Sequence, residues 1–363
     1  MFLLMKRTIT AIFLVAAVMA ANVRTSSACT GITLKSADGC TVVARSVEWA
    51  ASDNHGRYVV VPRGHEWLSM VPGGGTGRSF AGRYGYVGLA VEQDEFVVEG
   101  LNEKGLSAGL FYFPDYGRYE DYDPALRDSN ISDFQLVSYI LGRCATVAEV
   151  KEEIGKVHIH GFDPRSSTVH WRFADPSGAQ VVLEVIDGKC IFYDNTVGVL
   201  TNSPSFDWQL TNLNNYVNLL PGRAGENRLG NMDLRSFGGG SGFLGLPGDV
   251  TPPSRFVKAA FYQNTAPVRA NPDEASLEAF RILSAFNIPV GIQFPKGEDV
   301  ADIPSATQIT SVSDMSGLKL YYRTMWNSEI RCFELGKLDF AKIKFVSAPL
   351  DTVKSDPIHY IKL

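Results

Sequence analysis

The feature that most constrains this chain is the junction Ala28-Cys29-Thr30-Gly31, where an apolar leader meets a strand-like segment. A basic pair precedes the apolar run over residues 9–21, and Ser26-Ser27-Ala28 supplies the small residues that a signal peptidase reads. The run is short for a membrane anchor, which is the alternative. We therefore predict that residues 1–28 are a signal peptide. Removal of these 28 residues from 363 leaves 335 that begin with Cys29.

A second alternative for this junction is a lipoprotein signal, in which Cys29 itself would be lipidated. The residue three positions before the cysteine is Ser26, where lipoprotein signals carry a large aliphatic residue. Lipidation would acylate the amine and alkylate the sulfur of Cys29, so it excludes any chemistry that uses both groups. We expect a free Cys29 in an exported protein, periplasmic or secreted, with no stable membrane insertion after cleavage.

Charge and composition exclude further classes of partner. The leader carries three basic residues and no acid, so its removal changes the formal net charge from −5 to −8. No basic tract is present that would bind nucleic acid. No Pro- or Ser-rich linker, charge block or internal repeat interrupts the mature chain, which predicts a single domain over residues 29–363.

Cysteine and histidine spacing gives no metal site. There are five cysteines, an odd number, so at least one stays free in an exported protein, where the others tend to pair. No Cys-x-x-Cys or Cys/His ligand spacing is present. His158 and His160 would share one face of a strand but lack a third ligand. We expect no metal and no cofactor.

The mature N-terminus is predicted to be a β-hairpin. Residues 30–35 alternate in polarity, Asp38-Gly39 marks a turn, and residues 41–47 are mostly β-branched or apolar. Antiparallel pairing of the two strands would return Arg45 and Glu48 beside Cys29. The spacing therefore places a thiol, a guanidinium and a carboxylate in one corner.

Beyond the hairpin, strand-like and helical blocks follow one another. Strands are expected at residues 58–62, 96–101, 106–111, 171–174, 180–186, 189–193, 197–201, 307–312, 318–324, 330–335 and 341–346. Helices are expected over residues 131–141 and 206–220 and from Thr146, Pro252 and Asn271. The strands expected between residues 171 and 201 are predicted to form one antiparallel meander. Because the turns are hairpin turns, the order favours an α+β fold of antiparallel sheets packed with helices over alternating βαβ units.

The corner around Cys29 is typical of nucleophilic catalysis. A cysteine acts as its thiolate and needs a base, and the α-amine of an N-terminal cysteine, with an unperturbed pKa of roughly 7.7–8.0, is suited to that task. Arg45 would favour the thiolate, and Glu48 would orient the amine. Asn202 ends a predicted strand just before a helix, where a rigid amide can donate to an oxyanion, although many asparagines in such places are turn residues.

The chain resembles the choloylglycine hydrolase family, which comprises bile salt hydrolases and penicillin V acylases among the N-terminal nucleophile hydrolases. The motifs that carry the resemblance are Cys29-Thr30-Gly31, Asp38-Gly39, Ala44-Arg45, Asn102-Glu103-Lys104-Gly105-Leu106, Val199-Leu200-Thr201-Asn202-Ser203-Pro204, Phe206-Asp207-Trp208, Gly245-Leu246-Pro247-Gly248-Asp249 and Ser254-Arg255-Phe256. The resemblance implies a four-layer αββα sandwich and hydrolysis of a linear non-peptide amide without metal or cofactor.

The resemblance also implies roles for individual residues. Cys29 matches the nucleophile, Arg45 the arginine that stabilises the thiolate, Asn202 the oxyanion donor and Arg255 a second arginine of the site. Members of the family are often homotetramers, so a homo-oligomer is expected. The stretch over residues 206–248 is expected to include an assembly loop.

Three positions bear on efficiency and selectivity. Glu48 stands where the family usually has aspartate, so its contact with the amine must be rebuilt. Tyr112 stands where many bile salt hydrolases have asparagine, as it does in penicillin V acylases, and a backbone N–H would still complete the oxyanion hole. Trp49 resembles a tryptophan of secreted Gram-negative members and either lines the pocket or packs in the core. The aromatic loop over residues 112–124 is either a packed surface loop or a grip for an apolar ligand.

The expected function is that of an exported amidase that cleaves an acyl amide through a thioester on Cys29. Glycine- or taurine-conjugated bile salts are the first choice of substrate, and penicillin V or acyl homoserine lactones are the alternatives. The alternative from another class is an exported or lipid-anchored binding protein of the same fold, made catalytically silent by Glu48.

Overall fold

The computed structural model describes residues 28–50, 52–162, 167–294, 296–297, 302–303 and 305–362. Of the predicted signal peptide, residues 1–27 lie outside the described residues. Among the described helices, none combines the length and the apolar character that crossing a membrane requires.

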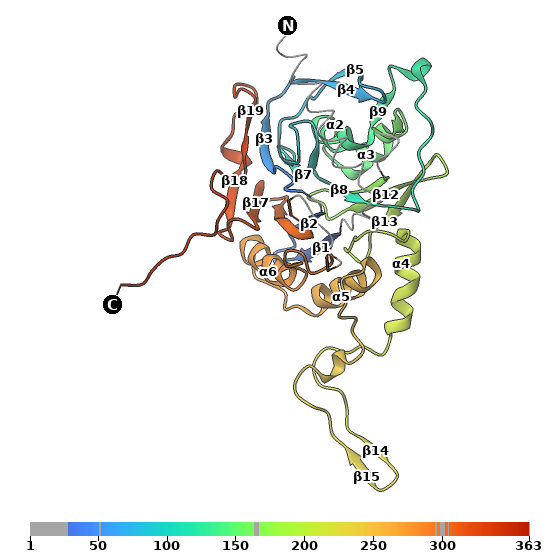
Figure 1. The fold of residues 1–363 in the computed structure, drawn as a ribbon, viewed down its shortest axis with the longest axis vertical. Helices are drawn as coiled ribbons and strands as arrows, with labels where there is room; N and C mark the ends of the chain where they lie inside the picture. Colours follow the sequence, from blue (N-terminus) through green and yellow to red (C-terminus); the bar gives the residue numbers. More distant parts are fainter. Residues whose placement is uncertain are drawn as a thin grey trace.

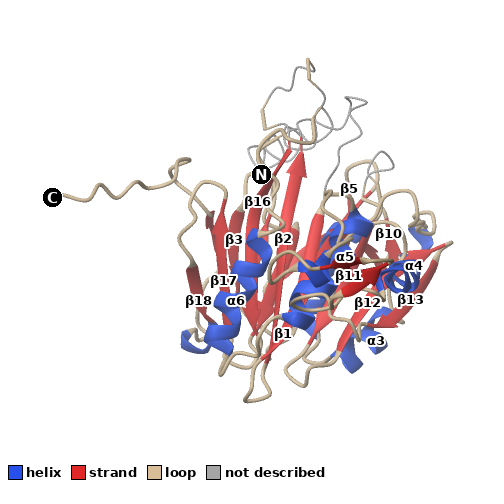
Figure 2. Cartoon of the chain, turned by 90° about the horizontal axis from the view of Figure 1, so that it is seen from below, coloured by secondary structure: helices blue, strands red, loops and turns tan. Residues whose placement is uncertain are grey.

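Two large antiparallel sheets form the centre of the molecule (Figures 1 and 2). The five-stranded sheet has the order β1 (Cys29–Lys35), β2 (Thr41–Ala50), β16 (Ser305–Asp314), β17 (Lys319–Thr324) and β18 (Arg331–Glu334). The eight-stranded sheet has the order β13 (Lys189–Asp194), β12 (Gln180–Ile186), β11 (Val169–Ala174), β8 (Ser107–Tyr112), β7 (Val97–Asn102), β6 (Tyr86–Ala90), β3 (Arg57–Val61) and β19 (Val346–Pro349).

Helices cover the outer faces of both sheets. Helices α5 (Pro252–Thr265) and α6 (Pro272–Ser284) pack on β1 and, for α6, on β2 and β16 of the five-stranded sheet. Helix α2 (Leu136–Arg143) packs on β6, β7 and β8, and α3 (Val147–Ile154) packs on β11. The architecture is therefore the predicted four-layer αββα sandwich.

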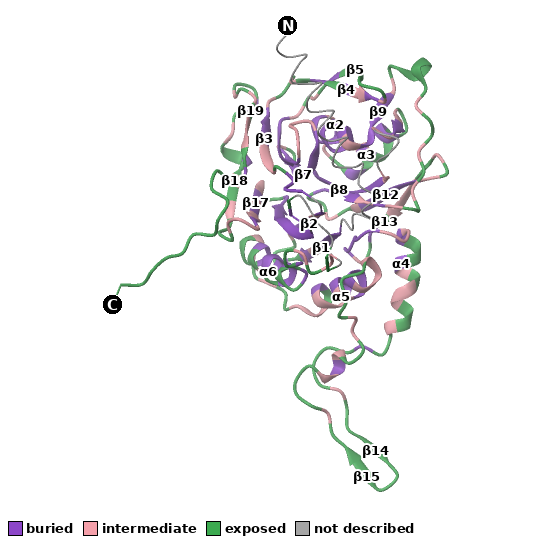
Figure 3. Cartoon of the chain, in the orientation of Figure 1, coloured by how far each residue is buried: buried purple, intermediate pink, exposed green. Residues whose placement is uncertain are grey.

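Smaller elements complete the chain. The hairpin of β4 (Glu66–Val71) and β5 (Gly75–Ala81) lies beside α2, and β9 (Asn130–Ser132) pairs in parallel with β10 (His158–His160). Helix α4 (Phe206–Asn212) leads toward an arm that carries β14 (Asn227–Leu229) and β15 (Met232–Leu234). Figure 3 shows this arm and the C-terminal tail as exposed segments that project from the body.

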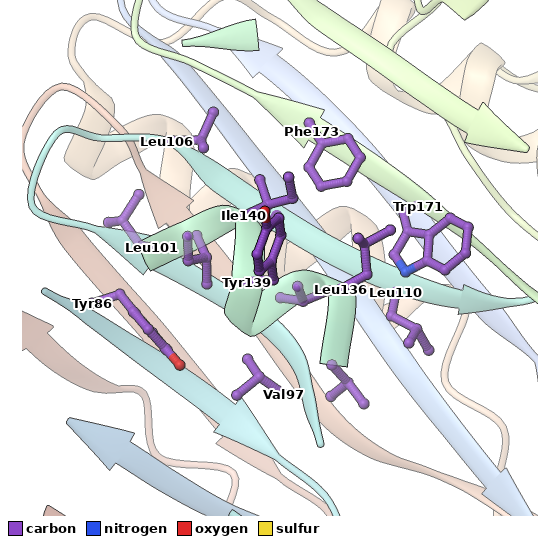
Figure 4. Packing of buried hydrophobic residues seen from close by; sticks show 14 of the residues in the cluster. Tyr86, Val97, Leu101, Leu106, Leu110, Leu136, Tyr139, Ile140, Trp171 and Phe173 are labelled. Atoms are coloured by element: carbon purple, nitrogen blue, oxygen red, sulfur yellow. The ribbon is translucent and has the colours of Figure 1, made fainter. Parts of the chain in front are cut away.

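The buried hydrophobic side chains form two clusters. The larger includes Val43 and Val47 of β2 together with the residues of α2 and the eight-stranded sheet shown in Figure 4. The smaller joins Cys29, Val42 and Ala44 to apolar residues of α5 and α6. Alternation along β2 sends successive side chains to opposite faces, so this one strand contributes to both clusters.

Local signals placed several elements correctly. Thr146 caps α3 by accepting from the backbone N–H of Glu149 at 3.2 Å, and Asn271 caps α6 by accepting from that of Glu274 at 3.0 Å. Pro252 begins α5 as expected. The first hairpin pairs in the predicted sense.

Most expected strands are shifted by one or two residues, and four expected elements differ more substantially. The helix expected over residues 131–141 begins only at Leu136, because Asn130–Ser132 pairs as β9. The helix expected over 206–220 ends at Asn212 and tightens into a 3₁₀ turn, where asparagine side chains bond to nearby groups instead of extending the helix. The last strand was expected over residues 341–346, but it begins only at Val346 and ends at Pro349.

The fourth difference concerns residues 197–201, which do not extend the meander after β13. Leu200 instead forms an isolated antiparallel bridge with Gly31 of β1, with N···O distances of 2.6 and 3.1 Å. The segment therefore crosses from one sheet to the other, and this crossing is what delivers Asn202 to the N-terminal strand.

Candidate functional site

The first hairpin sets the frame of the candidate site. Cys29 pairs with Val47, and Gly31 pairs with Arg45, so the register returns the end of β2 to the start of β1 as predicted. The backbone N–H of Glu48 donates to the carbonyl of Ala28 at 2.9 Å, which holds the predicted cleavage position against β2. Cys29 is buried, with 4% of its surface exposed.

Arg45 holds the sulfur of Cys29 from between the sheets. Its Nη2 donates to Sγ of Cys29 at 2.9 Å. Its Nη1 donates to the carbonyls of Val98, at 2.9 Å, and Leu110, which belong to the facing sheet. Its guanidinium carbon lies 4.1 Å from the centre of the Phe111 ring. Because these partners are carbonyls and a ring rather than carboxylates, the positive charge of Arg45 stays directed at the sulfur.

Asn202 and Arg255 hold the backbone of Cys29. Oδ1 of Asn202 accepts from the backbone N–H of Cys29 at 2.8 Å and from Nη2 of Arg255 at 2.6 Å. Nη1 of Arg255 donates to the carbonyl of Cys29 and, at 2.8 Å, to the hydroxyl of Thr30. Burial lowers the pKa of Arg255, and the charges of Glu48 and Cys29 act in the opposite direction.

The amide nitrogen of Asn202 is already engaged with the protein. Nδ2 donates to the carbonyl of Tyr112 at 2.7 Å. An amide NH₂ carries two hydrogens, so this bond uses one of the two. The same bond places Tyr112, predicted for the oxyanion or substrate pocket, beside Asn202 through its backbone.

Glu48 lies at this corner but does not contact the nitrogen of Cys29. Its Oε1 accepts from the hydroxyl of Thr307 at 2.9 Å, and its Oε2 has no hydrogen-bond partner among the described residues. Burial raises the pKa of Glu48, while the charges of Arg255 and Arg45 and the hydroxyls of Ser46 and Thr307 act to lower it. The carboxyl is thus a buried acid held by Thr307 of β16 rather than by Cys29.

Trp49 occupies an intermediate position. Its indole N–H donates to the hydroxyl of Ser52 at 2.9 Å, and its ring packs against the larger buried cluster while remaining partly exposed. These contacts include the core packing that was one of the two alternatives for Trp49. In the aromatic loop, Tyr119 also packs inward, since its hydroxyl accepts from the backbone N–H of Val169 at 2.8 Å.

A second layer behind Arg45 was not predicted. Arg172 of β11 donates to Glu99 of β7 at 2.9 Å, and both side chains are almost fully buried. Arg172 also lies over the Phe111 ring at 5.7 Å and donates to the carbonyl of Ala44 at 3.2 Å. The signal available in the sequence was an arginine within the otherwise apolar strand Trp171-Arg172-Phe173-Ala174.

Gly31 is explained by the same layer. A Cβ at this position would lie 3.0 Å from the Phe111 ring and 3.2 Å from Nη1 of Arg172. Gly31 is two residues from Cys29 and so shares its face of β1. Absence of a side chain at Gly31 therefore leaves room for Phe111 and the two arginines beside Cys29.

The remaining histidines and cysteines lie in other surroundings. His158 contacts Asn130 at 2.6 Å and Glu120 at 3.1 Å, and His160 packs against Tyr122. Within the described ranges no group of three or more His, Cys, Asp or Glu side chains is arranged to hold a metal ion. All five cysteines are free, so the tendency to pair expected for an exported chain is not realised in this structure.

Comparison with known proteins agrees with this architecture. A family model described as linear amide C–N hydrolases, choloylglycine hydrolase family, matches residues 29–354. The chain is 31% identical over 326 residues to a bile salt hydrolase/transferase of Clostridium perfringens, covering 87% of this chain and 95% of that protein.

Two solved structures share the fold over most of their length. A mutant of the conjugated bile acid hydrolase from Clostridium perfringens superposes with a TM-score of 0.79 at 27% identity, covering 92% of this chain and 100% of the other. Penicillin V acylase from Agrobacterium tumefaciens superposes with a TM-score of 0.72 at 25% identity, covering 90% and 95%. The match of the family model begins at the cysteine on which the site converges.

Proposed function

Because the chain belongs to the choloylglycine hydrolase family and is a hydrolase that acts on linear amides, we propose that it cleaves acyl amides through a thioester on Cys29 and prefers conjugated bile salts. The observation that carries the proposal is the 2.9 Å contact between Nη2 of Arg45 and Sγ of Cys29. Cys29 is the first residue of β1 and the first residue after the predicted signal peptide.

Acylation starts from the free α-amine and the thiol of Cys29. The amine takes the proton of the thiol, and the thiolate attacks the carbonyl carbon of the amide. The resulting ammonium then gives its proton to the leaving nitrogen as the C–N bond breaks. Water attacks the thioester with the same amine as base, which releases the acid and restores the thiol.

The oxyanion that forms during each attack needs fixed donors. We assign one to the second hydrogen of the Asn202 amide, whose orientation is set by Tyr112 and Arg255. The backbone N–H of Tyr112 is the second candidate donor, and it does not depend on the side chain at that position. Arg255 then acts on the reaction by holding Asn202 and the carbonyl of Cys29.

We assign Glu48 a role only in the chain that has been cleaved before Cys29. Its backbone N–H bonds to Ala28 in the uncut chain, and its Oε2 has no hydrogen-bond partner among the described residues. Cleavage before Cys29 creates an ammonium group at the position that Ala28 leaves. We propose that Oε2 accepts from this group, a contact that the longer side chain of glutamate reaches from β2.

Export and assembly belong to the same proposal. The leader over residues 1–28 directs the chain to the periplasm or the outside, and the arm around β14 and β15 joins copies of the chain in a homo-oligomer. Apolar side chains exposed on and next to the arm support a role in assembly. The exposed fraction is 86% for Val217, 71% for Leu229 and 95% for Phe237.

The choice of substrate is tested by parallel assays on the mature enzyme. We expect release of glycine from glycocholate with a higher kcat/KM than release of 6-aminopenicillanic acid from penicillin V or of homoserine lactone from its acyl derivatives. The reason is that a bile salt hydrolase is among the relatives that align with nearly their whole length. Clear turnover of penicillin V with none of glycocholate would reverse this ranking and make the protein a penicillin V acylase.

The state of Cys29 separates the enzyme from a lipid-anchored binding protein. We expect the intact mass of the exported protein to equal that of residues 29–363 with an unmodified cysteine at its N-terminus. A mass increased by a diacylglyceryl group would rule out the proposed chemistry, because both the sulfur and the amine are needed in free form.

A further inference from the structure

A buried histidine and a buried glutamate flank the segment that carries Asn202. His170 of β11 and Glu184 of β12 are fully buried, and Nδ1 of His170 lies 3.1 Å from Oε1 of Glu184. Nε2 of His170 lies 3.2 Å from the carbonyl oxygen of Thr201. Since a carbonyl only accepts, Nε2 carries a hydrogen and donates to Thr201.

Glu184 holds the other end of the same segment. Its Oε1 accepts from the backbone N–H of Phe206, the first residue of α4, at 2.9 Å. The two side chains therefore bind the carbonyl that precedes Asn202 and the amide that begins the following helix. Residues 201–206 are tied at both ends to one hydrogen-bonded pair.

The ring of His170 also packs beside Tyr112, the residue whose carbonyl accepts from Asn202. It stacks on Phe113, with ring centres 4.5 Å apart and planes inclined by 8°, and it meets the edge of Phe111 at 6.1 Å. Phe113 directly follows Tyr112, whose carbonyl accepts from Nδ2 of Asn202. One ring thus contacts both the segment that carries Asn202, through Thr201, and the segment that carries Tyr112, through Phe111 and Phe113.

We propose that His170 and Glu184 are positioning residues that orient the Asn202 amide for the oxyanion. The pair touches neither Cys29 nor Arg45 through any hydrogen bond that the structure describes, so it acts through Asn202 and leaves the thiolate alone. The inference rests on the proposed function, because an oriented amide donor matters only where an oxyanion forms.

The experiment compares His170→Phe, which keeps a ring on Phe113 but loses both nitrogens, with His170→Gln, which keeps a donor for Thr201. We expect kcat for amide hydrolysis to fall about 10- to 100-fold in His170→Phe with KM changed less than about threefold, since small misplacements of a catalytic group cost this much. In His170→Gln we expect most of kcat to return.

A second readout distinguishes positioning from general damage. Alkylation of Cys29 by iodoacetamide uses the thiolate but passes through no oxyanion, so its rate is expected to stay within about twofold of the wild type in His170→Phe. Hydrogen exchange at residues 201–206 is expected to accelerate in His170→Phe and in Glu184→Leu, because each change removes a hydrogen-bond partner of the segment. Where His170→Phe does not fold, Glu184→Leu carries the same comparison.

Tyr139→Phe is the matched control, since it removes a 2.6 Å hydrogen bond to the buried side of Glu153 in the helical layer outside the eight-stranded sheet. We expect it to lower stability and leave kcat unchanged. Equal losses of hydrolysis and alkylation, an unchanged kcat, or unchanged exchange at residues 201–206 in the His170 and Glu184 variants would overturn the proposal. Absence of amide turnover by the wild type would refute the proposed function, and the exchange experiment would still report on the anchored segment.

Discussion

Replacement of Cys29 by alanine is expected to abolish amide hydrolysis, with kcat reduced on the order of 10⁴-fold or more, as when the nucleophile of a protease is removed. Among the described residues Arg45 contacts no side-chain nucleophile other than this thiol, and the proposed thioester forms on its sulfur. The measurement is steady-state release of glycine from glycocholate by the purified mature enzyme. Folding is expected to be retained, because alanine loses one small buried atom.

The control for this prediction is Cys190→Ala. Cys190 is also a free thiol but is exposed on β13 at the far edge of the eight-stranded sheet. Hydrolysis should be unchanged in this variant. Residual activity of Cys29→Ala within about tenfold of the wild type would show that Cys29 is not the nucleophile, since oxyanion donors alone cannot supply the missing covalent step.

The second large effect is expected for Arg45→Met. This change removes the cation beside the sulfur and leaves the carbonyls of Val98 and Leu110 without their buried donor. We expect kcat/KM to fall by about 10² to 10³ and the rate of Cys29 alkylation to fall as well, because the sulfur loses its contact with the guanidinium. Each orphaned carbonyl should also destabilise the fold by about 1–3 kcal/mol. Steady-state kinetics, iodoacetamide alkylation and thermal unfolding measure the three effects.

Arg172→Met is the matched control for charge and burial. Arg172 is equally buried and also lies over the Phe111 ring, but its donors go to Glu99 and the carbonyl of Ala44 rather than to the sulfur. We expect it to lower the unfolding temperature at least as much, because it leaves Glu99 as an unpaired buried charge, and to change alkylation much less. Equal alkylation rates in the two variants would contradict a direct role of Arg45 on the thiolate.

Contacts between residues close together in the sequence could be predicted, and contacts between distant residues could not. The hairpin of β1 and β2 was predictable, because alternation and a turn define the register of strands joined by a short loop. Helix caps at Thr146 and Asn271 were predictable for the same reason, since donor and acceptor lie three residues apart. The proximity of Arg45 to Cys29 was therefore predictable from the pairing of these two strands alone.

Contacts between distant segments could not be read in this way. Asn202 was identified through a family motif, yet its bond to Cys29 joins residues 173 apart and depends on the crossing of residues 197–201 that periodicity assigned to the wrong sheet. A strand-like pattern states that a segment is extended and buried, but it does not state which neighbour will pair with it.

The sequence by itself determined that Arg45 reaches Cys29, and its motifs pointed to the family and to the layered fold, because these depend on neighbouring residues and on motifs of fixed spacing. Only the tertiary structure decided that Glu48 bonds to Thr307 and that Nδ2 of Asn202 donates to the carbonyl of Tyr112. It also decided that His170, paired with Glu184, bonds to the carbonyl of Thr201 next to Asn202. These arrangements arise where two sheets and a crossing segment meet, and buried polar groups there take whichever partner the packing brings within hydrogen-bond distance.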